Sequence, residues 1–254
     1  MYKLIKILAN FIFTSFQYSM NIQSIPQQQP TFTARNKELK NADKIMRNLM
    51  HEYPAFSTSR AKYYEIYTKK PQTRMKLLMP IYWKLCAARN ELKKYEDTNL
   101  LDKTLEMVKE EKNANCAEFA QMARAAFIAN GYKDVKIGSL RIHFPKEDSF
   151  LPPLVASKRA DHNVLLVNAG KNAKLDDPKT ISKKAFVVDP WGGFCDYVAN
   201  AFNKYKGIFL RNLPPEEQTA PKKFIFTEVK PLNVTETTCS TMAEKHPELV
   251  VKNK

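Results

Sequence analysis

Apolar positions along the chain follow two different periods, helical in the first half and strand-like in the second. Between residues 36 and 112 they recur every three to four positions, as at Leu39, Ala42, Met46 and Leu49. This spacing predicts helices over 36–53, 61–67, 73–94 with an interruption or kink at Pro80, and 100–112 with Asn99 as its cap. After residue 131, short aliphatic and aromatic runs predict strands at 134–144, 163–168, 184–189 and 223–229, with a helix over 195–205.

This order of elements predicts an α+β protein with four parts. Residues 1–35 form a flexible N-terminal segment, 36–112 a helical lobe, 113–232 the core, and 233–254 a polar C-terminal tail. The apolar stretch near the N-terminus resembles a weak signal peptide, and a misassigned start before Met20 is the alternative. It is too short to span a membrane, so we expect no transmembrane segment, and cytoplasmic and secreted locations both stay open.

The segment NANCAEFAQMARAAFIANG carries the clearest helix signals of the chain. Asn115 is a favourable N-cap, and Glu118 completes a capping box three residues later. Cys116 then occupies the first helical position, and Asn130-Gly131 ends the helix. Because the first turn of a helix presents free N–H groups and partial positive charge, it favours a thiolate over a thiol. The same N–H groups can stabilise an oxyanion formed when the sulfur attacks a carbonyl.

A histidine and an aspartate lie at the ends of two predicted strands. His162 begins an aliphatic run, and we favour it over His143, which lies on a strand-like segment of mixed polarity. Asp189 ends the strand before Pro190, and Gly192-Gly193 turns the chain. We expect Asp189 to accept the Nδ1 proton of His162 and so to fix the orientation of the ring. Trp191 and Glu118 are candidates for lining the cleft.

These segments resemble the papain-like and transglutaminase-like cysteine enzymes, and most of all the bacterial effector proteases and glutamine deamidases of that superfamily. The resemblance lies in the Asn-Cys-Ala-Glu helix start, the strand-borne histidine and the Val-Val-Asp-Pro-Trp segment. It implies a papain-like or transglutaminase-like core, in which a catalytic helix packs on an antiparallel sheet after a helical region. The implied roles are nucleophile for Cys116, general acid/base for His162 and orienting carboxylate for Asp189.

The chain departs from these enzymes around the nucleophile. Glu110 stands where papain-type proteases have a glutamine, and Ala117 stands where transglutaminases have a tryptophan. The candidates for the oxyanion hole are therefore Asn113 and Asn115, together with the backbone N–H of Cys116.

The resemblance implies a cysteine-dependent amide hydrolase that acts on a protein or peptide through a thioester. A peptide-bond substrate makes it a protease, and a glutamine side chain makes it a deamidase. Two alternatives stay open: a transglutaminase-like acyl transferase, and a non-catalytic basic binding module with Cys116 as core packing.

Composition narrows the range of partners. The net charge is +15, but the lysines are spread along the chain without a nucleic-acid-binding motif, which favours a solvated surface. The alternative is a binding surface for an acidic protein, nucleic acid or a membrane, and of these we expect a protein or peptide partner rather than nucleic acid. The four cysteines, at 86, 116, 195 and 239, form no zinc-binding pattern, and the six glycines form no phosphate-binding loop. We expect neither a metal nor a cofactor.

Overall fold

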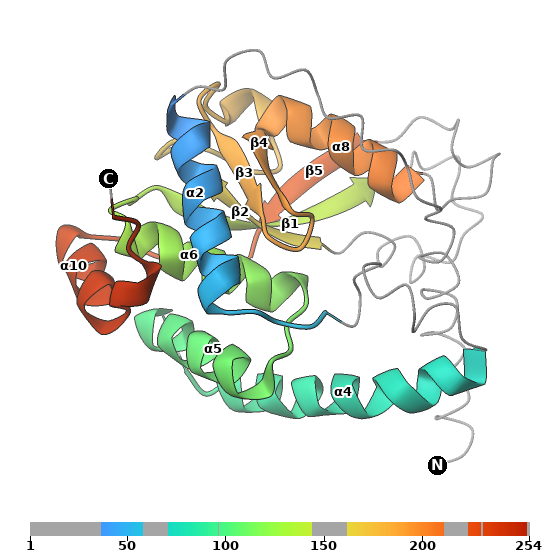
Figure 1. Ribbon diagram of the computed structural model, residues 1–254. Coiled ribbons are helices and arrows are strands. Elements are labelled where there is room, and N and C mark those ends of the chain that lie inside the picture. The colour runs from blue at the N-terminus through green and yellow to red at the C-terminus, as the bar shows by residue number, and fades with distance from the viewer. Residues whose placement is uncertain are drawn as a thin grey trace.

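The computed structural model describes residues 37–57, 71–95, 97–143, 162–210, 223–229 and 231–252. The N-terminal segment 1–35 and the helix expected at 61–67 lie outside these ranges. Figure 1 shows the helices gathered around a single sheet. Among the described helices, none has both the length and the apolar composition needed to cross a bilayer.

In the described part of the chain, the sheet has five strands, all paired antiparallel, in the order β4-β3-β2-β1-β5. The strands are β1 (Val135–His143), β2 (His162–Val167), β3 (Phe186–Asp189), β4 (Phe194–Tyr197) and β5 (Lys223–Glu228). A short 3₁₀ helix, η2 (Pro178–Thr180), lies in the connection from β2 to β3. The expected α+β class and the four predicted strands are confirmed.

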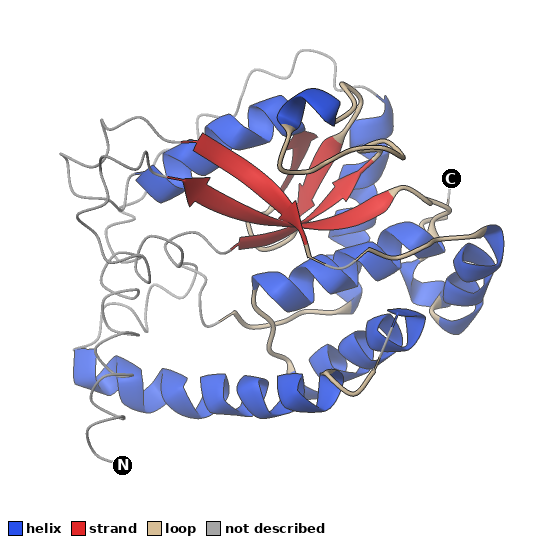
Figure 2. Ribbon diagram, turned by 180° about the vertical axis from the view of Figure 1, so that it is seen from behind, coloured by secondary structure: helices blue, strands red, loops and turns tan. Residues whose placement is uncertain are grey.

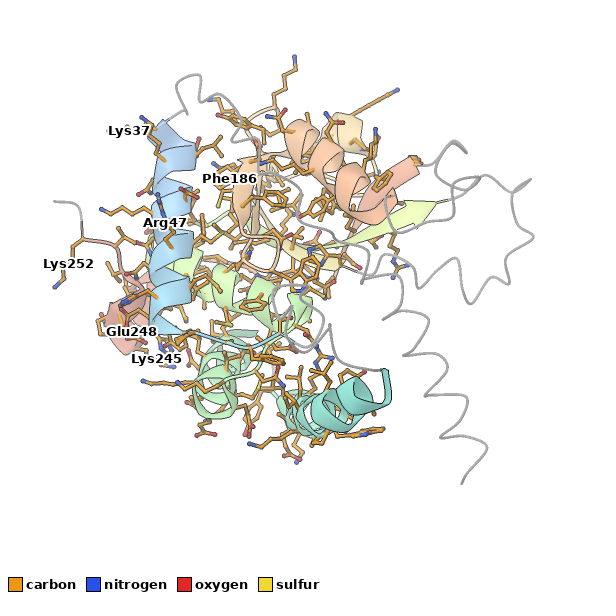
Figure 3. The ribbon with its side chains drawn as sticks, turned by 45° about the vertical axis from the view of Figure 1, so that its right-hand side comes forward. Lys37, Arg47, Phe186, Lys245, Glu248 and Lys252 are labelled. Atoms are coloured by element: carbon orange, nitrogen blue, oxygen red, sulfur yellow. The ribbon has the colours of Figure 1, made fainter. Side chains whose placement is uncertain are left out.

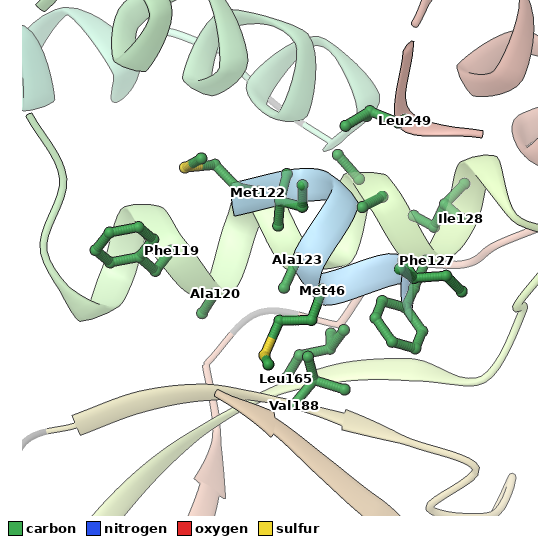
Figure 4. Close-up of a cluster of buried hydrophobic side chains, with 14 of the residues drawn as sticks. Met46, Phe119, Ala120, Met122, Ala123, Phe127, Ile128, Leu165, Val188 and Leu249 are labelled. Carbon is green, nitrogen blue, oxygen red and sulfur yellow. The ribbon is translucent and has the colours of Figure 1, made fainter. Parts of the chain in front are cut away.

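Helices cover both faces of the sheet, which explains why β2 is an unbroken apolar run after its first two residues. Helices α6 (Cys116–Ala129) and α2 (Lys37–Glu52) pack on one face, where Leu165 and Val188 meet the α6 side chains (Figure 4). Helix α8 (Val198–Leu210) packs on the other face, against Val164 and Leu166. Alternate residues of β2 therefore enter different cores, as the period of a strand requires.

The helices before α6 share its core. Helix α5 (Asp97–Glu111) packs on α6, and α4 (Pro71–Leu92) runs along α5 and continues through Pro80 (Figure 2). Residues of α2 and α5, such as Ile45 and Leu105, are buried in the same cluster as Phe119 and Phe127 of α6. Asn99 lies inside α5, so its predicted role as a cap is wrong.

Two further expectations from the sequence are wrong. The predicted helix over 195–205 starts too early, because β4 pairs with β3 through a tight turn at Pro190–Gly193 before α8 begins. The C-terminal segment, which we expected to be a polar tail, folds into α10 (Glu236–Lys245) and η3 (Pro247–Leu249). Cys239, Met242 and Leu249 of this segment are buried in the α6 core, and Figure 3 shows it beside α2.

Candidate active site

Helix α6 begins where the sequence predicts, with Cys116 as its first residue and Asn115 as its N-cap. The capping box is formed, and the Glu118 carboxylate accepts a hydrogen bond from the backbone N–H of Asn115 at 2.9 Å. Ser57, fully buried, donates to Oδ1 of Asn115 at 2.9 Å. These contacts fix the first turn of α6, and they leave Cys116 half-buried at its start.

His162 and Asp189 form a buried hydrogen-bonded pair. Nε2 of His162 lies 2.8 Å from Oδ2 of Asp189, and the two side chains are 4% and 1% exposed. The predicted pairing of these residues is therefore present, but the predicted ring nitrogen is wrong, because Nε2 rather than Nδ1 faces the carboxylate. The reason is the rotation of the ring about its side-chain bonds, which no sequence pattern determines.

The carboxylate of Asp189 receives three hydrogen bonds from the described residues. Besides His162, the hydroxyl of Tyr205 donates to Oδ2 at 2.8 Å, and the backbone N–H of Gly192 donates to Oδ1 at 2.8 Å. A Cβ atom at Gly192 would lie 2.6 Å from Oδ2 of Asp189, so only glycine fits this turn. A buried carboxylate held by several donors is stabilised as the anion in one fixed position.

Aromatic rings enclose the imidazole of His162. The ring of Trp191 lies 4.6 Å from it between centroids, and the ring of Tyr205 lies 5.6 Å from it. Trp191, a cleft candidate from the sequence, thus covers the His162–Asp189 pair. Exclusion of water by these rings strengthens the electrostatic interactions of the pair.

The side chain of Cys116 interacts electrostatically with that of His162, although the two residues come from opposite sides of the sheet. His162 shares a sheet face with Val164 and Leu166, whereas α6 packs on the other face. In the register of the two strands, Val188 of β3 stands opposite Leu165, so β3 ends before the level of His162. The thiol can therefore reach the imidazole past the end of β3. Since Asp189 holds Nε2, the ring nitrogen left for Cys116 is Nδ1.

The charges of this group support one another. Burial alone would lower the pKa of His162, but the charge and hydrogen bond of Asp189, followed by those of Cys116, raise it to about 10. Burial alone would raise the pKa of Asp189, but His162, Gly192 and Tyr205 hold it below its ordinary value. Burial and the nearby Asp189 charge raise the pKa of Tyr205 well above its ordinary value. At neutral pH the pair is therefore imidazolium and carboxylate, and Tyr205 is a neutral donor.

The two asparagines predicted for the oxyanion hole are both occupied in part by other contacts. Nδ2 of Asn113 donates to the carbonyl of Ile81 at 3.1 Å, while its buried Oδ1, an acceptor, has no partner among the described residues. Oδ1 of Asn115 accepts from Ser57. Because this contact uses the acceptor oxygen of Asn115 and not its amide N–H groups, Asn115 stays a candidate donor, together with the backbone N–H of Cys116 at the helix start.

Glu118, the second cleft candidate, is 4% exposed and is held by an arginine. Its carboxylate receives Nε and Nη2 of Arg89, from α4, at 2.7 and 2.8 Å. Glu118 is thus the buried member of an ion pair in the first turn of α6.

Three contributors to this site were not predicted. Tyr205 lies at the helical spacing of Val198, Ala201 and Phe202, so the sequence pattern could have predicted that its side chain is buried. The pattern could not have predicted its contact with Asp189. Arg89 and Ser57 carry no local signal, because only the tertiary packing brings them to α6.

No protein-family profile matches the sequence, and comparison with curated proteins and with solved structures found no similar protein. Within the described ranges, no group of three or more His, Cys, Asp or Glu side chains is arranged to hold a metal ion.

Proposed function

We propose that this protein is a cysteine-dependent amide hydrolase that acts on protein or peptide substrates through a thioester. The observation that supports the proposal is the position of the His162 side chain between Asp189 and Cys116. The buried imidazole of His162 is hydrogen-bonded through Nε2 to Asp189 and interacts with the thiol of Cys116 at the start of a helix. A thiol, an imidazole and a carboxylate in this order are the parts of a nucleophilic triad.

In the first half-reaction, the Cys116 thiolate attacks the carbonyl carbon of the amide. The resulting oxyanion is stabilised by N–H groups at the start of α6. As the carbon–nitrogen bond breaks, the His162 imidazolium gives its proton to the departing nitrogen, which leaves a thioester on Cys116.

The second half-reaction needs His162 as a base. Once the sulfur is acylated it carries no charge, so its contribution to the raised pKa of His162 is lost. The neutral imidazole can then take a proton from water, whose oxygen attacks the thioester carbon. The carbon–sulfur bond breaks, the acid product leaves, and the thiolate and imidazolium are restored. Asp189 holds the ring throughout.

Alkylation of the folded protein with iodoacetamide at about pH 6.5 tests the triad, because this reagent selects thiolates. Cys86, half-buried like Cys116, is an internal control in the same chain. We expect adducts on Cys116 in preference to Cys86, and loss of this preference in His162→Gln. Equal labelling of the two cysteines, unchanged in His162→Gln, would contradict the proposal and favour a binding module.

The reaction itself is tested by mass spectrometry of acidic and neutral proteins incubated with wild type and with Cys116→Ala. Cleaved chains that appear only with wild type indicate a protease, and conversion of glutamine to glutamate indicates a deamidase. Crosslinks between glutamine and lysine would instead assign a transglutaminase.

A further inference from the structure

The start of α6 contains an electrostatic conflict. Glu118 is needed there, because its carboxylate accepts the backbone N–H of Asn115 and so completes the capping box. The same carboxylate is a buried negative charge two residues from Cys116, and a like charge at that range disfavours a thiolate. A helix start that favours an anionic nucleophile thus contains an anion of its own.

The guanidinium of Arg89, in α4, compensates the negative charge of Glu118. Its guanidinium contacts both carboxylate oxygens of Glu118, Nε at 2.7 Å and Nη2 at 2.8 Å, in the paired geometry that makes arginine–carboxylate contacts strong. The arginine side chain is 30% exposed and that of Glu118 only 4%, so the carboxylate of the pair is buried at the first turn of α6.

Arg89 also interacts with the nucleophile. Burial would lower the pKa of Arg89, but the hydrogen bond and charge of Glu118, and then the charges of Cys116 and Cys86, raise it. Among the described residues, Cys116 also interacts with His162 from β2 and with Tyr205 from α8. Tyr205 is neutral, whereas Arg89 and His162 are cations.

We propose that Arg89 is a positioning residue of the candidate site, which neutralises Glu118 so that this carboxylate can cap α6 without disfavouring the Cys116 thiolate. The inference rests on the proposed function, since it concerns the state of the nucleophile. It assigns α4, which contributes no residue to the Cys116–His162–Asp189 group, a role in the reactivity of Cys116.

The test is the rate of Cys116 alkylation as a function of pH in four full-length variants. Arg89→Met leaves Glu118 uncompensated, so we expect alkylation at about pH 6.5 to be about threefold to tenfold slower, with the whole profile displaced to higher pH. Glu118→Gln keeps an oxygen for the cap and removes the charge, so we expect no slowing. The double variant Arg89→Met/Glu118→Gln should return to within about twofold of wild type.

Lys84→Met is the matched control, because it removes one cation from the same helix. Lys84 pairs with Glu111 instead of Glu118, and we expect its profile to equal that of wild type. Thermal unfolding of each variant separates folding from reactivity, and Arg89→Lys, which keeps the charge, provides a second variant if Arg89→Met is unstable.

A purely structural role for the ion pair would slow Arg89→Met and Glu118→Gln equally, with no recovery in the double variant, and that result would overturn the inference. An unchanged profile in Arg89→Met would do the same. Failure of the proposed function would give a different result. Cys116 would be alkylated at the same rate in wild type and in His162→Gln, in both of which Arg89 is intact.

Discussion

Among the described residues, two partly or fully buried histidines each face an aspartate through Nε2, with nearly the same hydrogen bond but different surroundings. In the candidate site, Nε2 of His162 lies 2.8 Å from Asp189. Near the C-terminus, Nε2 of His246 lies 3.1 Å from Oδ1 of Asp102. The first pair is 4% and 1% exposed, and the second is 13% exposed at both side chains.

The two pairs differ most in the other side chains that contact them. His162 also interacts with a thiol, whereas Nδ1 of His246 lies 3.5 Å from the carboxylate of Glu248. Asp102 also accepts from Lys245, and Glu248 accepts from the hydroxyl of Tyr53. The second pair therefore joins the C-terminal segment to α5 and α2, as a network between packed elements. A histidine beside a carboxylate thus becomes a candidate catalytic group only where its second nitrogen faces a nucleophile.

The largest expected difference between the two pairs concerns Cys116. Replacement of His162 by Gln removes the imidazolium that stabilises the thiolate, so the reactivity of Cys116 should fall toward that of an ordinary cysteine. An ordinary thiol is only about 1% ionised at about pH 6.5, so we expect alkylation to slow by up to about 100-fold. His246→Gln is the control and should leave the rate unchanged. Similar slowing in both variants would remove the distinction between the pairs.

The pH dependence of stability should also test the His162–Asp189 pair. The pKa of His162 is raised from 6.5 to about 10, so its stabilising contribution is complete below pH 6.5 and is lost as the pH rises toward 10. Over this window the free energy of unfolding should fall by at most about 1.4 kcal/mol per pH unit through this group. The lowered pKa of Asp189 gives the opposite sign in acid, with stability lost as the pH falls below its ordinary value of 3.8.

Urea unfolding of wild type and His162→Gln between neutral and alkaline pH measures this slope. The curve of the variant should be flatter than that of wild type. Parallel curves for wild type and His162→Gln would mean that His162 is not protonated in the native state.

The turn after β3 allows a steric test of the candidate site. Gly192→Ala would bring a Cβ atom to 2.6 Å from Oδ2 of Asp189 and 2.9 Å from the ring of Phe194. We expect a loss of about 2 kcal/mol in the free energy of unfolding, together with slower alkylation of Cys116. Gly207→Ala, in α8 with open space around the new atom, should be neutral or stabilising. Equal effects of the two variants on unfolding would argue against the close contact.

The smallest expected effect is that of Tyr205→Phe. It removes one of three donors to Asp189 while the other two remain, so we expect a loss of about 1–2 kcal/mol in stability and a few-fold slowing of alkylation. Tyr132→Phe removes a hydroxyl that pairs with Asn41 and should leave alkylation unchanged. If Tyr205→Phe labels at the wild-type rate, then Tyr205 contributes to packing rather than to the orientation of the pair.

Local signals explain which parts of this arrangement were predictable. The position of Cys116 follows from the capping residues Asn115 and Glu118, and the position of Asp189 follows from the proline after it. Both patterns act over a few residues of the chain, so they can be read without the fold. The same holds for His162, because the aliphatic run after it defines the strand.

The parts that could not be predicted depend on tertiary contacts. The four-residue strand β4 is stabilised by its pairing with β3 and the turn between them, and Cys195 within it also fits a helical pattern. The choice of Nε2 for Asp189 depends on the rotation of the ring within its pocket of aromatic residues. The contact of Arg89 with Glu118 joins two helices that are separated by α5 in the chain.

The most direct test of the account is the titration of His162 by nuclear magnetic resonance of its ring nitrogens, in wild type and in Cys116→Ala. We predict that the ring in wild type stays protonated through neutral pH and titrates near pH 10, and that its pKa falls in Cys116→Ala because the sulfur partner is gone. A pKa that is the same in wild type and in Cys116→Ala would contradict the pairing of Cys116 with His162.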